Sequence, residues 1–211
     1  IEILWRTDEP GSSTVRFGLA DTTEFTVTDD QAVVLHKVTL EGLTPAAVYL
    51  YQVESASGTV KATSALYDFA AAPALRSAPV RFAAVSDTEV ASVTRSLAQK
   101  ILADGPDLVI HAGNLQNDDP ANPASWDTCY FNPMKELGAY APVFPVLGNL
   151  DYPSSRNPAA TPQLFLDYFS LPGDERFYSF DYGCVHFAAL DLYQDSDAPD
   201  NWYLTGSQRA W

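Results

Sequence analysis

The stretch "PDLVIHAGN" (Pro106–Asn114) decides the fold of this 211-residue chain, because an apolar run ends there in a short polar turn. Such a run is typical of a strand buried within a sheet. Similar stretches lie on either side, "VRFAAVSD" at 80–87 and "PVFPVLGN" at 142–149. Helical patterns separate them, as in "TRSLAQKILADG" (94–105), which has Gly105 as its expected stop. This alternation predicts a layered α/β domain.

The rest of the second half adds shorter elements. "WDTCYFNPMKELGAYA" (126–141) is predicted to be partly helical, and "TPQLFLDYFSL" (161–171) to form a short helix or turn. "RFYSFDYGCVHFAALDL" (176–192) has the pattern of a β-hairpin with its turn at Tyr182-Gly183.

The first 72 residues have a different pattern of apolar and polar side chains. Short alternating stretches rich in β-branched and aromatic residues recur between turn signals, which predicts an antiparallel β-sandwich over 1–72. Tyr49 is the expected tyrosine-corner residue, with a buried ring and a hydroxyl bonded back to the preceding loop. We assign 73–79, within the Pro/Ala-rich stretch Ala70–Pro79, as a linker and 80–211 as the second domain.

The charge and composition limit the classes of function. The formal net charge of -15 argues against a nucleic-acid partner, because phosphates would be repelled. No run of eighteen apolar residues predicts a membrane span. The acidic composition, rich in tyrosine and tryptophan, favours a secreted, periplasmic or cell-surface protein. The chain starts at Ile1 without Met, so we expect either that processing has removed a segment or that the sequence is an excerpt.

The two cysteines are Cys129 and Cys184. Two residues cannot form a zinc cluster by themselves. They are expected either to form one disulfide or to be two buried free thiols.

Three strand ends carry polar side chains. Asp87, Asn114 and Asn149 each end one of the predicted α/β strands, and such ends gather at one edge of an open sheet. One carboxylate and two amide oxygens would suit a hard cation, with Glu89 as a further ligand. Each residue alone could equally cap a helix or form an Asx turn. The set of three therefore predicts a site, with Leu150 as an unexpected apolar neighbour.

The order of these segments resembles the metallophosphoesterase superfamily, and the N-terminal sandwich makes the chain similar to purple acid phosphatases with a fibronectin type III-like domain whose first strand is clipped. The resemblance is carried by "ILWRTDEPGSSTVRFG", "LEGLTPAAVYLYQV", "VRFAAVSD", "PDLVIHAGNL", "FPVLGNLDYP" and "RFYSFDYGCVHFAALD". It implies a site at the strand ends where two metals polarise a phosphate ester and generate a hydroxide nucleophile.

The first two ligand motifs of that family are altered here. The first strand normally ends in Gly-Asp; Asp87 matches, but Ser86 replaces the glycine, and Glu89 stands where some members have His. The second strand normally ends in a Gly-Asp whose carboxylate bridges both metals, and this chain has Asn114. The tyrosine of purple acid phosphatases falls at Asn117, so their charge-transfer chemistry is not expected.

The third motif, Gly-Asn-His followed by Glu or Asp, is matched by Asn149 and Asp151, but Leu150 replaces the His. That His stabilises the transition state or protonates the leaving oxygen, and leucine can do neither. The resemblance places the family's remaining histidines further C-terminal than "GSQRAW", so we expect 80–211 to correspond to the N-terminal half of the family domain. None of His36, His111 and His186 matches a ligand position, and each is expected to be packed or on the surface.

The resemblance and its departures lead to one expectation and two alternatives. We expect a degenerate metallophosphoesterase that is inactive and is used for binding or assembly, with a protein partner or self-assembly. The second hypothesis is an active phosphomonoesterase or phosphodiesterase with a mononuclear site of Asp87, Asn114, Asn149 and Glu89. The third is that the sequence is an excerpt of a longer, active enzyme, whose further part could supply histidines but could not replace Asn114 or Leu150. No cofactor is expected under the first hypothesis; under the second the ion is Fe, Mn, Zn or Ca, and the substrate is a phosphate ester.

Overall fold

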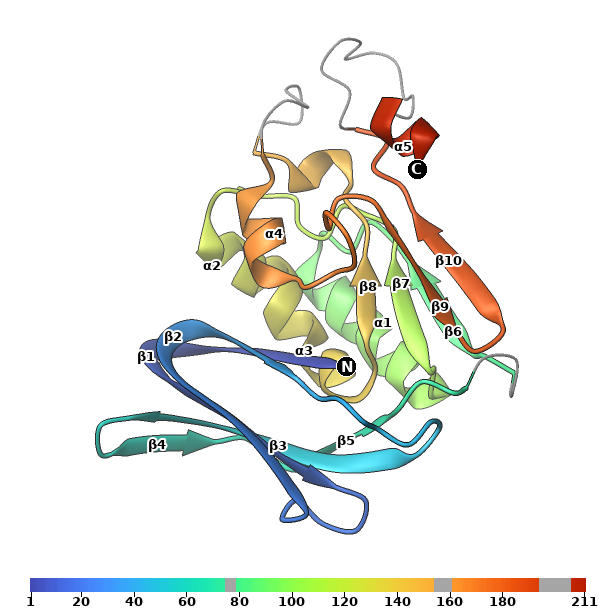
Figure 1. The fold of residues 1–211 in the computed structure, drawn as a ribbon. Helices are drawn as coiled ribbons and strands as arrows, with labels where there is room; N and C mark the ends of the chain where they lie inside the picture. The colour runs from blue at the N-terminus through green and yellow to red at the C-terminus, as the bar shows by residue number, and fades with distance from the viewer. Residues whose placement is uncertain (75–78, 154–160, 194–205) are drawn as a thin grey trace. The chain divides into compact units, whose positions relative to one another are not determined.

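The structure is a computed structural model that describes residues 1–74, 79–153, 161–193 and 206–211. The chain divides into two compact units, Ile1–Ala74 and Leu75–Trp211 (Figure 1). The division falls inside the stretch assigned as a linker, part of which, 75–78, lies outside the described residues. Among the described residues, no helix has both the length and the apolar composition needed for a membrane span.

The N-terminal unit is built from antiparallel strands. They are β1 (Glu2–Gly18), β2 (Phe25–Thr39), β3 (Val48–Ser57), β4 (Val60–Thr63) and β5 (Tyr67–Ala70). The order is β2-β1-β3-β4, and β5 also pairs with β3. The separate short strands predicted for "IEILWRT" (1–7) and "STVRFGL" (13–19) are joined in β1, with register shifts against β2 on both sides of Gly11. A Cβ on Gly11 would lie 2.9 Å from the carbonyl oxygen of Ala56, so this irregular segment needs glycine for its close approach to β3.

The core of this unit confirms the tyrosine corner. The Tyr49 ring is buried, stacks on Phe69 at 5.6 Å, and accepts a 3.0 Å hydrogen bond at its hydroxyl from the backbone N–H of Thr44. The phenol therefore joins the start of β3 to the loop before it. The other buried apolar residues of this core are Ile3, Val15, Phe17, Val38, Leu40, Tyr51 and Ala71.

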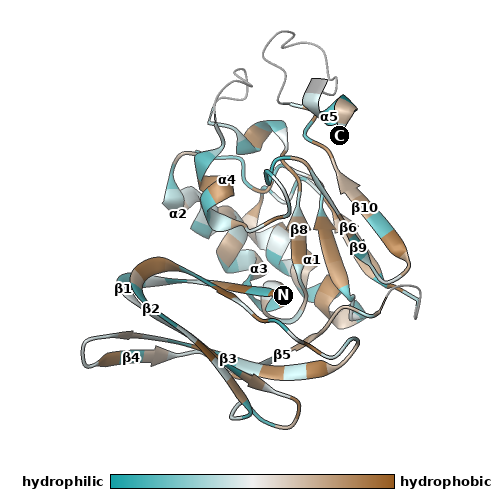
Figure 2. Cartoon of the chain, viewed as in Figure 1, coloured by the Kyte–Doolittle hydropathy of each residue, from teal (hydrophilic) through white to brown (hydrophobic). Residues whose placement is uncertain are grey.

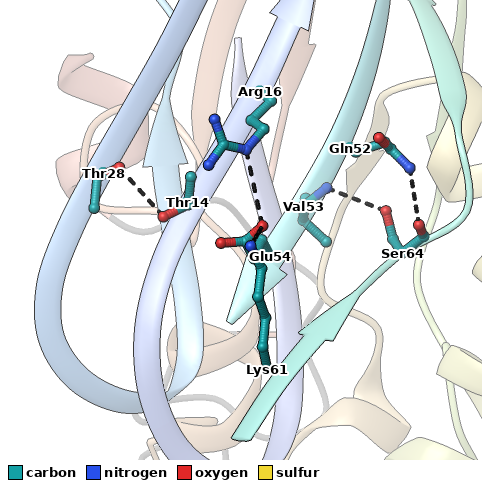
Figure 3. A network of polar contacts seen from close by, with 8 residues as sticks. All are labelled: Thr14, Arg16, Thr28, Gln52, Val53, Glu54, Lys61 and Ser64. Atoms are coloured by element: carbon teal, nitrogen blue, oxygen red, sulfur yellow. Dashed lines mark hydrogen bonds and ion pairs between the residues drawn. The ribbon is translucent and has the colours of Figure 1, made fainter. Parts of the chain in front are cut away.

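One polar network of the sheet is centred on Glu54. Its carboxylate lies 2.6 Å from Lys61 and 3.8 Å from Arg16 (Figure 3). Gln52 and the backbone of Val53 bond to Ser64 in the same view. Because both cationic side chains are largely exposed, each ion pair contributes only about 0–1 kcal/mol.

The C-terminal unit contains a parallel sheet and a hairpin. The sheet has the order β6 (Phe82–Val85), β7 (Leu108–His111) and β8 (Val143–Pro145), and β9 (Tyr178–Tyr182) pairs with β10 (Val185–Ala189). The helical elements are α1 (Ala91–Asp104), α2 (Pro123–Trp126), a π-helical turn (Asp127–Phe131), α3 (Asn132–Tyr140), a 3-10 turn (Asn149–Asp151), α4 (Gln163–Tyr168) and α5 (Gly206–Ala210). Gly105 ends α1 in the left-handed region, as predicted.

Successive side chains of β8 point to opposite faces of the parallel sheet. Val143 packs into the core that includes Ile101 of α1 and Leu137 of α3. Phe144, the next residue, stacks on Phe180 of the hairpin with ring centroids 3.9 Å apart. Helices therefore cover one face and the β9–β10 hairpin lies against the other. The strands β7 and β8 are drawn largely in brown in Figure 2, which marks them as apolar.

The burial predicted for the first strand is only partly found. β7 is almost completely buried, but β6 lies at the edge of the sheet and Phe82 keeps 47% of its surface exposed. Phe82 contacts Phe187 of the hairpin edge-on at 5.3 Å. An apolar run therefore marked a strand correctly, but it did not distinguish a central strand from an edge strand.

The cysteine prediction is wrong. Cys129 and Cys184 are free thiols, Cys129 is only partly buried, and Cys184 is exposed. The cause is a turn displaced by one residue: Tyr182 pairs with Val185, so the turn is Gly183-Cys184 and not Tyr182-Gly183. Cys184 therefore lies at the tip of the hairpin and not at the start of a buried strand.

Candidate functional site

The three polar loops leave the same edge of the parallel sheet. Val85 pairs with His111, and His111 pairs with Pro145, so β6, β7 and β8 end in register. The loops that follow carry Asp87, Asn114 and the 3-10 turn with Asn149 and Leu150. The structure thus places the three predicted strand ends together, as the parallel order requires.

Asp87 and Asn114 are in direct contact. The Asn114 side-chain nitrogen Nδ2 donates a 2.9 Å hydrogen bond to Oδ1 of Asp87. The other end of the same amide, Oδ1, accepts a 3.1 Å hydrogen bond from the backbone N–H of Leu150. Reversing the amide would put a donor against this N–H and an acceptor against the carboxylate, so only the observed orientation satisfies both contacts. Asn149 belongs to the adjoining loop, one residue before Leu150.

The backbone at this edge is unusual. Asp87 and Asn114 both adopt φ of 54°, in the left-handed region that aspartate and asparagine tolerate better than other non-glycine residues. Gly113 has φ of 90°, and a Cβ there would lie 2.8 Å from the Cα of Gly148. The glycine of each Gly-Asn pair therefore lets the second and third loops approach each other closely.

Asp151 is a buried carboxylate held by backbone N–H groups. It accepts hydrogen bonds from Asn114 (2.9 Å), Leu115 (2.9 Å) and Gly148 (2.8 Å), and only 1% of its surface is exposed. Burial raises the pKa of Asp151 to about 7, although the same N–H groups act to lower it. Asp151 therefore ties the second loop to the third. Asp151 lies three residues after Gly148 and accepts from its backbone N–H, which is one of the two contacts of a capping box; glycine has no side chain to make the other.

Gln116 was missed by the sequence analysis. It is completely buried, and its Nε2 donates a 2.8 Å hydrogen bond to the carbonyl of Leu150. Its Oε1 accepts hydrogen bonds from Ser125 and from the backbone of Asp118. Together with Asn114, Gln116 thus binds both backbone polar groups of Leu150. No periodicity or spacing marks a glutamine for such a role.

The first loop carries two acidic side chains, Asp87 and Glu89. Hydrogen bonds from Asn114 and Ser86 hold the pKa of the exposed Asp87 carboxyl below its usual value. Glu89 accepts a 3.2 Å hydrogen bond from Asn117, the residue at the family's tyrosine position. Glu89 is thereby paired within the protein.

The three histidines have structural surroundings, as expected. His36 is buried in the N-terminal sheet, and His186 is exposed beside Asp181 at 2.7 Å. His111 is buried under the first loop, where Nε2 bonds to the Thr88 hydroxyl at 2.7 Å. Burial lowers the pKa of His111 to about 4, so this ring is neutral near pH 7.

The residues of this edge do not fit a two-metal centre. The side-chain N–H of Asn114 points at Asp87 and bonds to it directly. A bridging carboxylate at position 114 would instead need a cation between the two side chains. Leu150 offers only an apolar side chain. Within the described ranges, no group of three or more His, Cys, Asp and Glu side chains is placed to hold a metal ion. The donor set is one exposed carboxylate and neutral amides, which compensates two adjacent cations poorly.

A parallel sheet with helices on one face, a hairpin on the other and polar loops at its carboxyl edge defines a layered α/β domain. Residues 80–206 match the calcineurin-like phosphoesterase family, and the chain belongs to that family.

The full chain is similar to purple acid phosphatases. It is 26% identical over 210 residues to purple acid phosphatase 23 of Arabidopsis thaliana, an alignment that covers 84% of this chain and 43% of the relative. The purple acid phosphatase PPD1 from yellow lupin (Lupinus luteus) seeds has a similar fold, with a TM-score of 0.73 and 16% identity over 90% of this chain and 42% of that one. PhoD matches with a TM-score of 0.63 and 14% identity over 89% of this chain and 46% of that one.

This chain therefore spans less than half the length of the relatives it matches. The similarity includes the N-terminal unit, which fits a fibronectin type III-like domain, and the tyrosine corner agrees with this assignment.

Proposed function

We propose that this protein is a calcineurin-like phosphoesterase that has lost its metal centre and its hydrolytic activity, and that it acts as an exported binding or assembly protein. The observation that carries the proposal is the hydrogen bond from Asn114 to Asp87. Two carboxylates at these positions would require cations between them, whereas an amide and a carboxylate satisfy each other directly.

The loss of activity follows from the chemistry that hydrolysis requires. Cleavage of a phosphate ester needs a polarised phosphoryl group, an activated water and help for the leaving oxygen. Asn114 weakens the first two functions because it cannot bridge two cations, and Leu150 cannot supply the third. Each loss corresponds to about 10²–10³ in rate, although losses within one site need not multiply.

A role in binding or assembly is supported by the retained fold and the acidic composition. The strand-end geometry survives because backbone hydrogen bonds and side-chain bridges hold it, as at Asp151. A formal net charge of -15 favours an exported protein that contacts another protein or a further copy of itself, and disfavours nucleic acid. We place it in a secreted, periplasmic or cell-surface compartment.

The second candidate is an active phosphoesterase with one metal ion, Fe, Mn, Zn or Ca. One observation favours it: Asp87 is exposed and its pKa is lowered, so an ionised carboxylate faces solvent at the strand ends. Asn114, Asn149 and Glu89 would complete the oxygen ligands. Because Glu89 and Asn114 already have partners within the chain, we favour the metal-free function.

The test uses the protein at its full natural length. Metal content would be measured by mass spectrometry after purification without chelator, and hydrolysis of p-nitrophenyl phosphate and bis-p-nitrophenyl phosphate with Mn²⁺, Zn²⁺, Fe or Ca²⁺ added in turn. The expected result is less than about one metal per ten chains and a rate at least about 10²-fold below that of an ordinary purple acid phosphatase assayed alongside. Stoichiometric metal or a rate within tenfold of that control would overturn the proposal.

A further inference from the structure

The side chain of Asn114 links three loops that belong to three different strands. Its nitrogen bonds to Asp87, which follows β6, and its oxygen accepts from the backbone of Leu150, which follows β8. Asn114 itself follows β7. We name the chain of contacts Asp87–Asn114–Leu150 the Asn114 bridge.

Backbone conformation does not explain why asparagine is found at 114. Its φ of 54° would suit glycine, aspartate or asparagine. Its backbone N–H is bound by Asp151, and this contact is independent of the side chain. The residue type is therefore decided by the side chain, which needs a donor for the Asp87 carboxylate and an acceptor for the N–H of Leu150. Among these three residue types, only asparagine carries both at neutral pH.

A carboxylate at this position would reverse one of the two contacts. Aspartate could still accept the N–H of Leu150, but its second oxygen would lie beside Oδ1 of Asp87 without a proton between them. Two ionised carboxylates in hydrogen-bond contact repel unless a cation or a shared proton joins them. Asparagine thus removes the requirement for a cation at this edge.

We infer that Asn114 is the positioning residue that holds the three strand-end loops together, and that it makes their geometry independent of metal. The inference deepens the proposed function and rests on it, since it assumes that no ion joins Asp87 to residue 114. The bridge retains the fold's loop arrangement after the loss of the site's chemistry, and it keeps this edge available as a rigid surface.

The experiment measures thermal unfolding of the full-length protein in EDTA. Asn114→Asp is expected to lower Tm by at least about 4 °C, because the contact with the backbone N–H of Leu150 holds the new carboxylate beside Asp87 and the two cannot easily move apart. The matched control is Asn117→Asp, the same change three residues further on, beside Glu89 on an exposed position. The control also brings two carboxylates together, but the side chain at 117 is exposed and can turn into solvent, so the expected shift in Tm is less than about 2 °C.

An exchange variant makes the test specific. Asp87→Asn combined with Asn114→Asp restores one amide and one carboxylate. The amide introduced at position 87 can donate to the carboxylate introduced at position 114, whose other oxygen can still accept from the backbone N–H of Leu150. The double variant is expected to recover at least half of the Tm lost by Asn114→Asp. Aspartate and asparagine are tolerated at both left-handed positions, so backbone strain changes little.

Each outcome decides the inference. A Tm for Asn114→Asp within about 2 °C of wild type, or an exchange variant no more stable than Asn114→Asp, overturns it. If Asn114→Asp does not fold, a soluble exchange variant supports the bridge, and an insoluble one overturns it. Failure of the proposed function gives a different signature: wild type would gain several degrees of Tm on replacing EDTA with about 1 mM Mn²⁺.

Discussion

Gly148 and Asn114 approach so closely that a Cβ on Gly148 would lie 2.3 Å from Oδ1 of Asn114. Gly148 has φ of -102°, which any residue can adopt, so glycine is required here by the contact and not by its conformation. Glycine at position 148 therefore allows the loop after β8 to contact the loop after β7. This relationship gives the most direct test of the strand-end geometry.

Gly148→Ala should destabilise the protein by at least about 2 kcal/mol, because the new methyl group must push Asn114 away from Leu150. Thermal or urea unfolding would measure the loss. Gly138→Ala is the matched control: Gly138 lies in α3, and a Cβ there meets nothing within 4 Å. This control should stabilise the protein by about 0.5–1 kcal/mol, since alanine is the better helix former. Equal effects of the two changes would contradict the close approach.

Asp151→Asn should cost about 1–3 kcal/mol of unfolding free energy. The amide can place its oxygen where Oδ2 accepts from Asn114 and Gly148, but its NH₂ then faces the N–H of Leu115. Asp167→Asn, on an exposed face of α4, is the control and should change stability by less than about 0.5 kcal/mol. Urea denaturation of both variants and of wild type in the same buffer measures the two losses. A loss of similar size at Asp167 would show that Asp151 has no special role.

Local sequence signals predicted several elements of the C-terminal unit but misplaced one turn. Apolar runs and a glycine stop predicted β7, β8 and α1, because burial and helix periodicity are local signals. The same signals could not place the hairpin turn within one residue, and that error moved Cys184 from a buried strand to an exposed tip. A register shift of one residue reverses every side chain.

The sequence predicted which loops meet at the candidate site, but it did not predict which atoms are in contact there. Parallel strands bring Asp87, Asn114 and Asn149 to one edge, which follows from topology. Which atoms meet there depends on two left-handed backbones and on close approach at Gly113, and neither is visible in hydrophobic periodicity. That Asn114 binds Asp87 directly, and does not face a shared cation, emerged only from the geometry.

His36 is a buried neutral imidazole in the N-terminal sheet. Thr7 donates its hydroxyl proton to the Glu9 carbonyl, so it accepts at 2.8 Å from Nε2 of His36. Nδ1 then accepts from the Ser13 hydroxyl, also at 2.8 Å, and the ring stacks on Trp5. Burial lowers the pKa of His36 below its usual value, because a charged ring would be poorly solvated there.

This lowered pKa predicts loss of stability in acid. A group with a depressed folded-state pKa contributes stability above its unfolded pKa, about 6.5 for histidine, and loses it as the pH falls through and below that value. The unfolding free energy of wild type should fall relative to His36→Gln by up to about 1.4 kcal/mol per pH unit below about pH 6.5. Urea unfolding of both proteins between about pH 8 and pH 5 gives this difference, in which other titrating groups largely cancel. A constant difference over the range would refute a neutral buried His36.

The last prediction concerns restoration of metal binding at the strand ends. Asn114→Asp combined with Leu150→His adds a carboxylate beside Asp87 and an imidazole in the next loop, which are ligands that Mn²⁺ and Zn²⁺ accept. We expect the double variant of the full-length protein to bind Zn²⁺ at least tenfold more tightly than wild type by isothermal titration calorimetry. Its Tm should rise with added Zn²⁺, because a ligand that binds only the folded state stabilises it by mass action.

Asn117→Asp combined with Leu150→His controls for the added charge and the added imidazole, and it should bind no more tightly than Leu150→His alone. Its new carboxylate lies beside Glu89 and not beside Asp87. Tighter binding by the Asn114 variant alone would locate the lost site at the Asn114 bridge. Equal binding by both would show that any added carboxylate in these loops raises the affinity for Zn²⁺. Asn114 would then no longer be identified as the substitution that abolished the metal centre.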